Sequence, residues 1–326
     1  MMFMRNCLQI KDMKVFRHIL LLLLVVCFSC EKSIDYQLKN QKSEIVMYAF
    51  PMPDSILKVH GSATTNILSV NNYEGVEGMQ MSIVLDEEKV METEYPYGQE
   101  WYEATGVKGQ EKINVELIYE TKNGLIVSGK TVIPEAVKIV SIDTVSVDVQ
   151  NLDNEEERML RCYIEFNDPP NELNYYQVRV DSEKQIKDDE GVISESVETI
   201  EYIKEDKVFS IRDDESVLLT DIDFQGSFND FVFDGSNYKL KILIPQEYHE
   251  IEDGAIKQSL KVHLYSITED YYRFLRSSIS EEAYREYPFF ERVNVYSNVT
   301  NGLGVVAGLS LHMDSVSLFN SEIEPF

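Results

Sequence analysis

The strongest constraint on the fold is a succession of short alternating runs separated by turn signals. Residues 113–119 alternate between apolar and polar side chains, and residues 125–133 form a second run that ends at Pro134. The linking residues 122–124 are Lys-Asn-Gly, and Asn-Gly between such runs predicts a β-hairpin in which both residues tolerate a positive φ. Further runs of this kind occupy residues 44–50, 56–63 and 79–85. Without a helical pattern between the runs, residues 43–134 are predicted to form an immunoglobulin-like β-sandwich.

A second β-rich unit is predicted over residues 135–326, so that the chain is mainly β and holds two immunoglobulin-like β-sandwich units. Turn residues at 188–191 lie between two strongly charged runs, and they predict a protruding ribbon. Asp234-Gly235 predicts a hairpin between residues 231–233 and 238–244. The other candidate strands are residues 137–149, 160–166, 175–180, 293–296 and 304–311.

One short α-helix is predicted in the C-terminal unit, near residues 268–280. Ser266-Ile-Thr-Glu269 matches a capping box, in which the first and fourth side chains bond to each other's backbone N–H groups. Helical spacing places five residues on one face, which we expect to be buried. These residues are Tyr271, Phe274, Leu275, Ser278 and Ile279.

The N-terminus has the pattern of a bacterial secretory signal. From Met13 onward, a basic stretch is followed by the apolar run 19–28 and then by Ser29-Cys30. The apolar run has ten residues, whereas a membrane-spanning helix needs about 20. Residues 1–29 are therefore predicted to be a signal peptide, with translation starting at Met13.

Ser29-Cys30 resembles a bacterial lipobox, which implies cleavage between these two residues and acylation of Cys30, for example with palmitate. The polar residues 30–42 would then form a tether to the membrane. Glu31 and Asp35 lie close behind the cysteine, and acidic residues there resemble a signal for export to the cell surface. We expect a lipid anchor at the outer membrane, facing the periplasm or, with some preference, the cell surface. The alternative is a plain signal peptide with a chance cysteine.

Charge and cysteine content narrow the function further. The formal net charge is −27 and the pI is near 4.5, which argues against a nucleic-acid partner, because phosphate binding needs clustered Lys and Arg. After cleavage, Cys30 and Cys162 are the remaining cysteines. If Cys30 is acylated, no disulfide can form within the chain, and Cys162 is predicted to be a small buried hydrophobe.

No catalytic residue, metal ligand or cofactor is predicted. The histidines His60, His249, His263 and His312 show no metal-ligand spacing. Ser310 follows Gly308 as in a nucleophile elbow, but its run has the pattern of a strand and not of a strand–turn–helix. Residues 221–226 resemble the start of a calcium loop, yet its twelfth position is Val232, which lacks a carboxylate. A plain turn is therefore favoured at 221–226, and the chain is expected not to be an enzyme.

Aromatic clusters and modification patterns are the remaining signals. Aromatic side chains are dense at residues 95–102, 271–272 and 287–290, and such side chains anchor sugars and proteins or simply fill a core. Three Asp-Ser/Thr-apolar triplets resemble an O-glycosylation pattern. Their acceptor residues are Ser55, Thr144 and Ser315.

Several of these motifs together resemble a Bacteroidota lipoprotein family, domain of unknown function 4249. The residues that carry the resemblance are 30–32, 45–54, 132–134, 166–169, 174–176, 269–272 and 297–304. The most specific run is the last, Ser-Asn-Val-Thr-Asn-Gly-Leu-Gly. The resemblance implies a lipoprotein often encoded beside a TonB-dependent outer-membrane receptor, without a known activity.

Three functional hypotheses follow. The first is a non-enzymatic accessory lipoprotein that binds a ligand or the receptor itself through its β-sandwich units. The second is a structural or adhesive surface lipoprotein whose acidic face is a solubilising coat. The third, a glycan or peptide hydrolase, requires a pair of carboxylates about 5–9 Å apart in a cleft.

Overall fold

The computed structural model describes residues 43–65, 75–150, 156–188, 190–210, 222–251, 254–285 and 293–320. These residues belong to one unit, 43–326, and they form strands, one α-helix and two short 3-10 helices. The expectation of a mainly β chain with one helix in its C-terminal part is confirmed. None of the described helices is both long and apolar enough to span a membrane.

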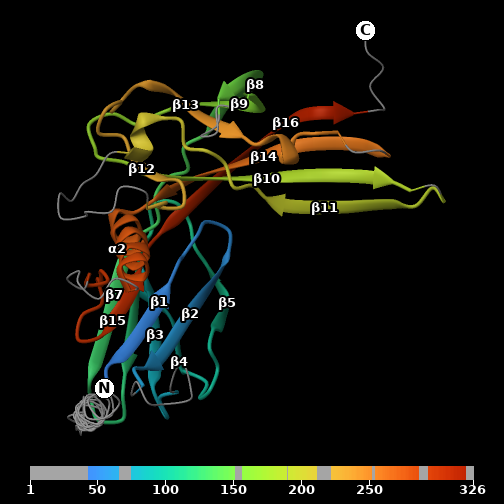
Figure 1. Ribbon diagram of the computed structural model, residues 1–326. Helices are drawn as coiled ribbons and strands as arrows, with labels where there is room; N and C mark the ends of the chain where they lie inside the picture. The colour runs from blue at the N-terminus through green and yellow to red at the C-terminus, as the bar shows by residue number, and fades with distance from the viewer. Residues whose placement is uncertain are drawn as a thin grey trace, which may run out of the picture. The chain divides into compact units, whose positions relative to one another are not determined.

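The first seven strands form two facing sheets (Figure 1). Their bounds are β1 Ile45–Ala49, β2 Ile56–Ala63, β3 Gln80–Leu85, β4 Glu88–Glu94, β5 Tyr102–Lys108, β6 Asn114–Glu120 and β7 Ile126–Val132. One sheet has the order β1-β2-β5 and the other has the order β4-β3-β6-β7. Met47 and Val59 from the first sheet share one buried cluster with Met81 and Leu117 from the second. Two sheets that share a core form the predicted immunoglobulin-like sandwich.

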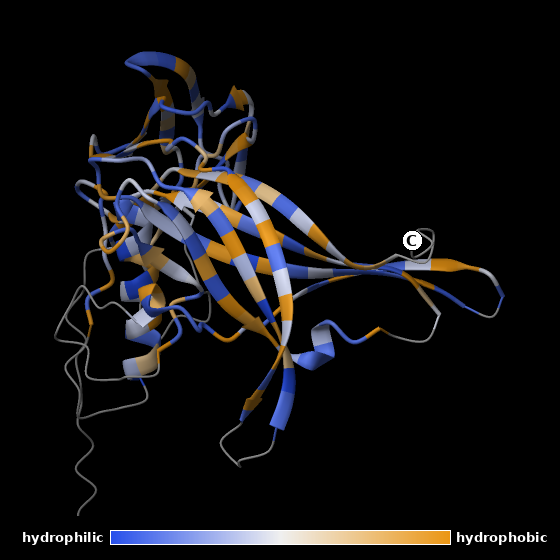
Figure 2. Cartoon of the chain, turned by 90° about the horizontal axis from the view of Figure 1, so that it is seen from above, coloured by the Kyte–Doolittle hydropathy of each residue, from blue (hydrophilic) through white to orange (hydrophobic). Residues whose placement is uncertain are grey.

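The period-two pattern explains which side chains enter this core. In β6, Val115, Leu117 and Tyr119 are buried, whereas the residues between them are more exposed. The same alternation of hydrophobic and hydrophilic residues runs along the strands in Figure 2. The hairpin β6–β7 is formed, but only Gly124 of the Asn-Gly pair has a positive φ, of 75°. The expectation for Asn123 was wrong, because the loop is a turn from Thr121 to Gly124 in which the last residue, Gly124, is the single left-handed one.

The second sandwich also consists of two sheets. Its elements are β8 Ile139–Gln150, β9 Glu156–Asn167, β10 Tyr175–Lys187, β11 Ile193–Thr199, η1 Lys207–Ser210, β12 Ser227–Asn229, β13 Asn237–Ile244, η2 Gln246–Tyr248, β14 Ala255–Ile267 and β16 Leu309–Asn320. The sheets have the orders β13-β9-β8 and β11-β10-β14-β16, with β12 paired to β10. Ile164 and Phe166 of one sheet share a buried cluster with Val178 and Leu264 of the other.

The two sandwiches repeat one connection pattern. In each, the first, second and fifth long strands form one sheet, and the fourth, third, sixth and seventh form the other in that order. The short strand β12 and the strand β15, Leu303–Val306, are additions to this pattern. A turn closed by the hydrogen bond from the N–H of Gly191 to the C=O of Asp188 joins β10 to β11, as predicted, although β11 is shorter than the expected run 192–203.

Strand β15 joins the first sandwich although it follows β14 in the chain. It pairs in parallel with β1, with Met47 opposite Gly304, and Val306 lies in the first core. Residues from both sides of position 134 therefore contribute to one sheet, while the domain boundary itself stays a prediction. The expected single run 304–311 was wrong, because it is divided between β15 and β16 in two different sheets.

Two other predicted strands are absent from the described structure. Residues 231–233 lie in turns, with Phe231 75% exposed and Phe233 buried, and β13 pairs with β9 instead. Residues 293–296 have no regular structure, and the N–H of Tyr296 donates to the side chain of Ser277. Alternation alone identifies a β-compatible run, but it cannot show whether a partner strand is available.

The helix α2, Glu269–Arg285, is capped at its N-terminus by Thr268 and not by Ser266. Thr268 Oγ1 accepts the N–H of Tyr271 at 3.4 Å, whereas Ser266 lies in β14 and its Oγ accepts the N–H of Val137. The capping-box prediction was therefore wrong, because Ser266 serves the sheet. The buried helix residues also differ from the expected face, of which only Leu275 is buried. They are Tyr272, Leu275, Ser280 and Tyr284.

Candidate functional site

The predicted modification sites differ in what the structure shows of them. Ser29 and Cys30, the cleavage and lipidation sites, lie outside the described residues, as do the aromatic residues at 287–290. Ser55 is exposed in the turn before β2, Thr144 is partly exposed in β8, and Ser315 is exposed in β16. Their side chains are thus accessible to differing degrees, and glycosylation stays a prediction.

Cys162, Ser310 and His312, which could have served a chemical function, have structural roles in the second sandwich. Cys162 is fully buried as a free thiol, and burial raises its pKa to about 12, so it behaves as the small hydrophobe that was predicted. Ser310 is also fully buried, in β16, and its hydroxyl donates to the backbone oxygen of Pro134. His312 Nδ1 accepts the N–H of Ile139 at 3.2 Å. Ser310 therefore does not have the exposed turn position of a hydrolase nucleophile.

Several aromatic side chains lie together as a stripe on the outer side of the β1-β2-β5 sheet. The rings of Tyr48 and His60 are 5.7 Å apart, and His60 lies 5.5 Å from the ring of Trp101. Phe274 of α2 also lies 5.7 Å from Tyr48. Trp101 is 41% exposed, so this stripe offers an aromatic contact surface of modest size. Tyr95, by contrast, is buried in the first core.

The hairpin β10–β11 ends in an open sheet edge. Among the described strands, β11 pairs only with β10, and all seven of its residues are exposed. Val192, Ile193 and Val197 are 59%, 55% and 67% exposed. The free edge of β11 presents backbone N–H and C=O groups that could pair with another chain.

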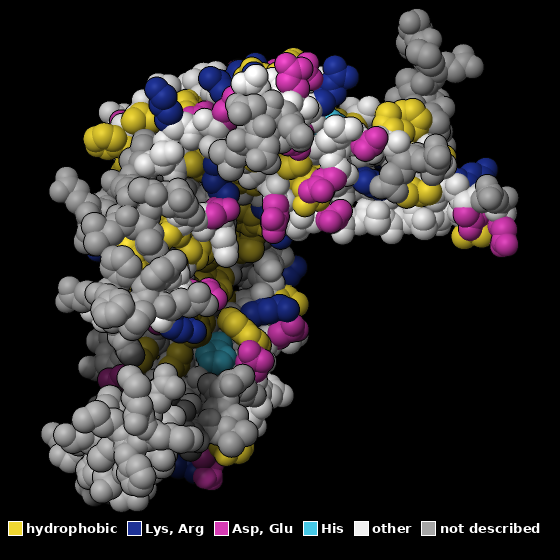
Figure 3. Space-filling view, in the orientation of Figure 1, with side chains coloured by type: hydrophobic (Ala, Val, Ile, Leu, Met, Phe, Trp, Pro, Cys, Tyr) yellow, Lys and Arg dark blue, Asp and Glu magenta, His cyan; other side chains and the backbone are white. Residues whose placement is uncertain are grey.

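In Figure 3, acidic side chains are scattered over the visible face and do not form one patch.

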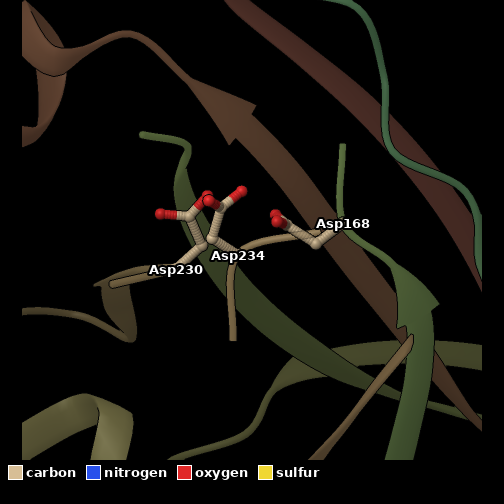
Figure 4. Close-up of side chains that lie close together, drawn as sticks. All are labelled: Asp168, Asp230 and Asp234. Carbon is tan, nitrogen blue, oxygen red and sulfur yellow. The ribbon is translucent and has the colours of Figure 1, made fainter. Parts of the chain in front are cut away.

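Three aspartates from two distant segments of the chain meet at one end of the second sandwich (Figure 4). Asp168 directly follows β9, Asp230 directly follows β12, and Asp234 lies in the turn before β13. Because β13 pairs with β9 while β12 pairs with β10, these strand ends are brought together. One carboxylate oxygen from each aspartate lies within 4.8 Å of the other two.

Neutral donors hold two of these carboxylates in place. Asp168 accepts hydrogen bonds from the hydroxyl of Tyr176 at 2.5 Å and from the N–H of Gly235 at 2.8 Å. Asp230 Oδ2 accepts the backbone N–H of Asn174 at 2.9 Å and its side-chain amide at 3.1 Å. The other oxygen of Asp230, Oδ1, is buried and has no hydrogen-bond partner among the described residues.

The surroundings of this cluster disfavour the ionised form of its buried carboxyl groups. Asp168 is 5% exposed and Asp230 is fully buried, whereas Asp234 is exposed. Burial raises the pKa of Asp168, and the charge of Asp230 raises it further, against the hydrogen bonds from Tyr176 and Gly235. None of the three aspartates forms an ion pair with a described basic residue. One oxygen from each carboxylate lies within 4.8 Å of the others, which is closer than the carboxyl pairs of glycosidases, at about 5–9.5 Å.

The sequence analysis did not predict this cluster. Asp234 was interpreted as a turn residue beside Gly235, Asp168 was included only in the resemblance motif 166–169, and Asp230 was assigned no role. The motifs 166–169 and 174–176, which carried the family resemblance, supply Asp168, Asn174 and Tyr176 to the cluster. Only the pairing of β12 and β13 with neighbouring strands shows that the three carboxylates meet.

Fold and site together define a protein of two β-sandwiches with repeated connectivity and an acidic cluster at one loop end. The family model described as domain of unknown function (DUF4249) matches residues 31–313, and the chain belongs to this family. No curated protein gives a significant match. Among solved structures, the chain is similar to a two fibronectin type-III domain segment from chicken tenascin. That similarity has 12% identity over 69% of this chain and 90% of the tenascin segment, with a TM-score of 0.21.

Proposed function

We propose that this protein is a secreted lipoprotein, anchored to the outer membrane through Cys30, that acts as a non-enzymatic accessory partner of a TonB-dependent receptor. The lipobox at Ser29-Cys30 and the short leader before it support the anchor. Two β-sandwiches suit a binding role, because rigid sheets hold loops and edges in fixed positions for a partner. A hydrolase is not favoured, because the carboxylates of the one three-aspartate cluster among the described residues lie closer together than the acid pair of a glycosidase, and neutral hydrogen-bond donors hold two of them in place.

The observation that carries the proposal is the open edge of β11. Natural sheets usually protect their edge strands, because an exposed edge pairs readily with other chains. Here β11 has seven exposed residues, and two of them, Ile193 and Val197, are large and apolar on the same side of the strand. Glu195 lies between them, which disfavours self-association but allows a specific partner. We propose that the receptor binds this edge of the hairpin.

Affinity purification from outer membranes tests the proposal. Wild-type protein is expected to recover a TonB-dependent receptor, whereas Ile193→Asp combined with Val197→Asp is expected to lose most of it, because burying each introduced charge costs several kcal/mol. Val90→Asp, on the edge strand β4 and 43% exposed at that position, is the matched control and is expected to recover the receptor normally.

Recovery of no receptor by the wild-type protein contradicts the proposed partnership. Recovery that is equal for the wild type and the β11 variant contradicts the assigned contact surface. If protease treatment of intact cells releases a wild-type protein that recovers no receptor, the adhesive surface protein becomes the better hypothesis.

A further inference from the structure

The cluster of Asp168, Asp230 and Asp234 has more negative charge than its surroundings compensate. Two of the carboxylates are buried, and their described donors are a tyrosine hydroxyl, backbone N–H groups and an amide, all of them neutral. Transferring a carboxylate out of water is costly unless an opposite charge accompanies it. The described structure thus holds the negative charges together without a positive partner.

The unpartnered oxygen of Asp230 gives a second and independent indication. Asp230 is 0% exposed, and its Oδ1 has no hydrogen-bond partner among the described residues. One oxygen of its carboxylate lies on the side of Asp234 and Asp168, and the other is turned away from them (Figure 4). A buried carboxylate oxygen without a donor is rare in folded proteins, and a bound ion can satisfy such an oxygen where the chain itself does not.

We propose that Asp168, Asp230 and Asp234 bind a calcium ion. The ligand set consists of oxygen atoms alone, which hard cations prefer over transition metals. Two oxygens bound to one Ca²⁺ at its usual distances lie at most about 5 Å apart, and the three ligand atoms here lie within 4.8 Å of one another. The exposed position of Asp234 provides an entry path and allows water to complete the coordination shell.

Calcium is favoured over magnesium by the construction of the site. Magnesium requires a compact octahedron with ligands at about 2.0–2.1 Å, and it retains most of its water. Asp168 and Asp230 are buried and fixed by hydrogen bonds to the backbone of neighbouring segments, so that these two ligands cannot move freely into an ideal octahedron. Calcium tolerates such an irregular set of ligands. The bound ion would join the β9–β10 loop to the β12–β13 loop.

The position of Tyr176 allows ion binding at this site to be measured by luminescence. Its hydroxyl donates to Asp168, so an ion at this site lies close to a tyrosine ring. Terbium(III) replaces Ca²⁺ at oxygen sites, and its luminescence is sensitised by a nearby tyrosine. We expect the purified full chain to bind one terbium ion with tyrosine-excited luminescence, and we expect Ca²⁺ to displace it at a lower concentration than Mg²⁺ does.

Two variants distinguish binding at this site from a general attraction of cations to an acidic protein. Asp234→Asn is expected to fold normally, because the side chain is exposed, and to weaken terbium and Ca²⁺ binding by about tenfold or more. Asp148→Asn, which removes an exposed carboxylate on β8, is the control and is expected to bind as the wild type does. Calcium should also raise the Tm of the wild type and of Asp148→Asn, and raise that of Asp234→Asn much less.

Absence of saturable one-to-one binding overturns the proposal, as does binding that Asp234→Asn leaves unchanged. If the wild-type Tm is insensitive to Ca²⁺, the buried pair of carboxylates is compensated by a shared proton instead, and the proposal also fails. Asp230→Asn removes the ligand with the unpartnered oxygen. If this variant folds and still binds Ca²⁺ as tightly as the wild type, the assigned ligand set is wrong.

Discussion

At the scale of single residues, His263 and Asp181 form a buried polar pair between β14 and β10. His263 Nε2 lies 2.8 Å from Asp181 Oδ2, and the two residues are 6% and 4% exposed. Burial lowers the pKa of His263, and the charge of Asp181 opposes this only in part. Burial alone would raise the pKa of Asp181, but hydrogen bonds from Thr199 and Arg179 outweigh it and lower that pKa. The pair is therefore suited to neutral pH and not to acid.

This pair predicts a loss of stability in acid. Because the folded pKa of His263 is lowered, the folded state binds fewer protons than the unfolded state, and stability is lost as the pH falls below about 6.5. His263→Gln lacks this titration but keeps a polar side chain beside Asp181. Urea unfolding at pH 7, 6 and 5 should show a smaller loss of unfolding free energy in the variant, by at most about 1.4 kcal/mol per pH unit. Identical pH profiles for variant and wild type would falsify the assignment.

At the scale of elements, the pairing of β15 with β1 depends on a glycine. Gly304 has a φ of 111°, a conformation that side chains with a Cβ rarely adopt, and a Cβ there would overlap the carbonyl oxygen of Met47. The neighbouring Asn298 holds the strand from the other side, since its amide bonds to the N–H and the C=O of Val306. The most specific run of the family resemblance, residues 297–304, therefore has a structural purpose in joining β15 to the first sandwich.

Gly304→Ala is expected to destabilise the protein by roughly 2–4 kcal/mol, because backbone strain and a clash with Met47 add together. The control is Gly124→Ala, at a φ of 75° with no atom near the added Cβ, which should cost only about 1 kcal/mol. Urea denaturation of both variants measures the difference. Equal losses would mean that the close approach of β15 to β1 contributes nothing beyond the cost of the positive φ.

At the scale of the whole molecule, the predicted anchor and the net charge of −27 have opposite effects. The charge favours contact of the body with water, whereas a lipid chain favours the membrane. None of the described helices could span a membrane. The lipid expected on Cys30 would supply the association, at about 0.8 kcal/mol for each buried CH₂ group.

Cys30→Ala is therefore expected to move the protein from the membrane fraction to the soluble fraction. Cys162→Ala is the matched control, because that thiol is buried in the second sandwich and should leave the fractionation unchanged. Immunoblots of membrane and soluble fractions, with and without detergent, measure the distribution. A Cys30→Ala protein that still requires detergent for release would exclude the lipid anchor.

The sequence by itself determined the local features of the fold. Alternation in residues 113–119 and the turn signals at 122–124 and 188–191 depend only on neighbours along the chain, and the corresponding hairpins are formed. Cys162, placed in an alternating run, is buried as expected. A period of two specifies a face of a sheet wherever one face must exclude water, so these predictions needed no knowledge of distant residues.

Only the tertiary structure decided which segments meet. Ser266 matched a capping box but bonds to Val137, residues 304–311 are divided between two sheets, and the hairpin expected at Asp234 is replaced by pairing between β13 and β9. The aspartate cluster arises in the same way, from strand ends that are far apart in the sequence. Strand pairing is a long-range choice that depends on packing and on the available partners, and no local pattern of side chains records it.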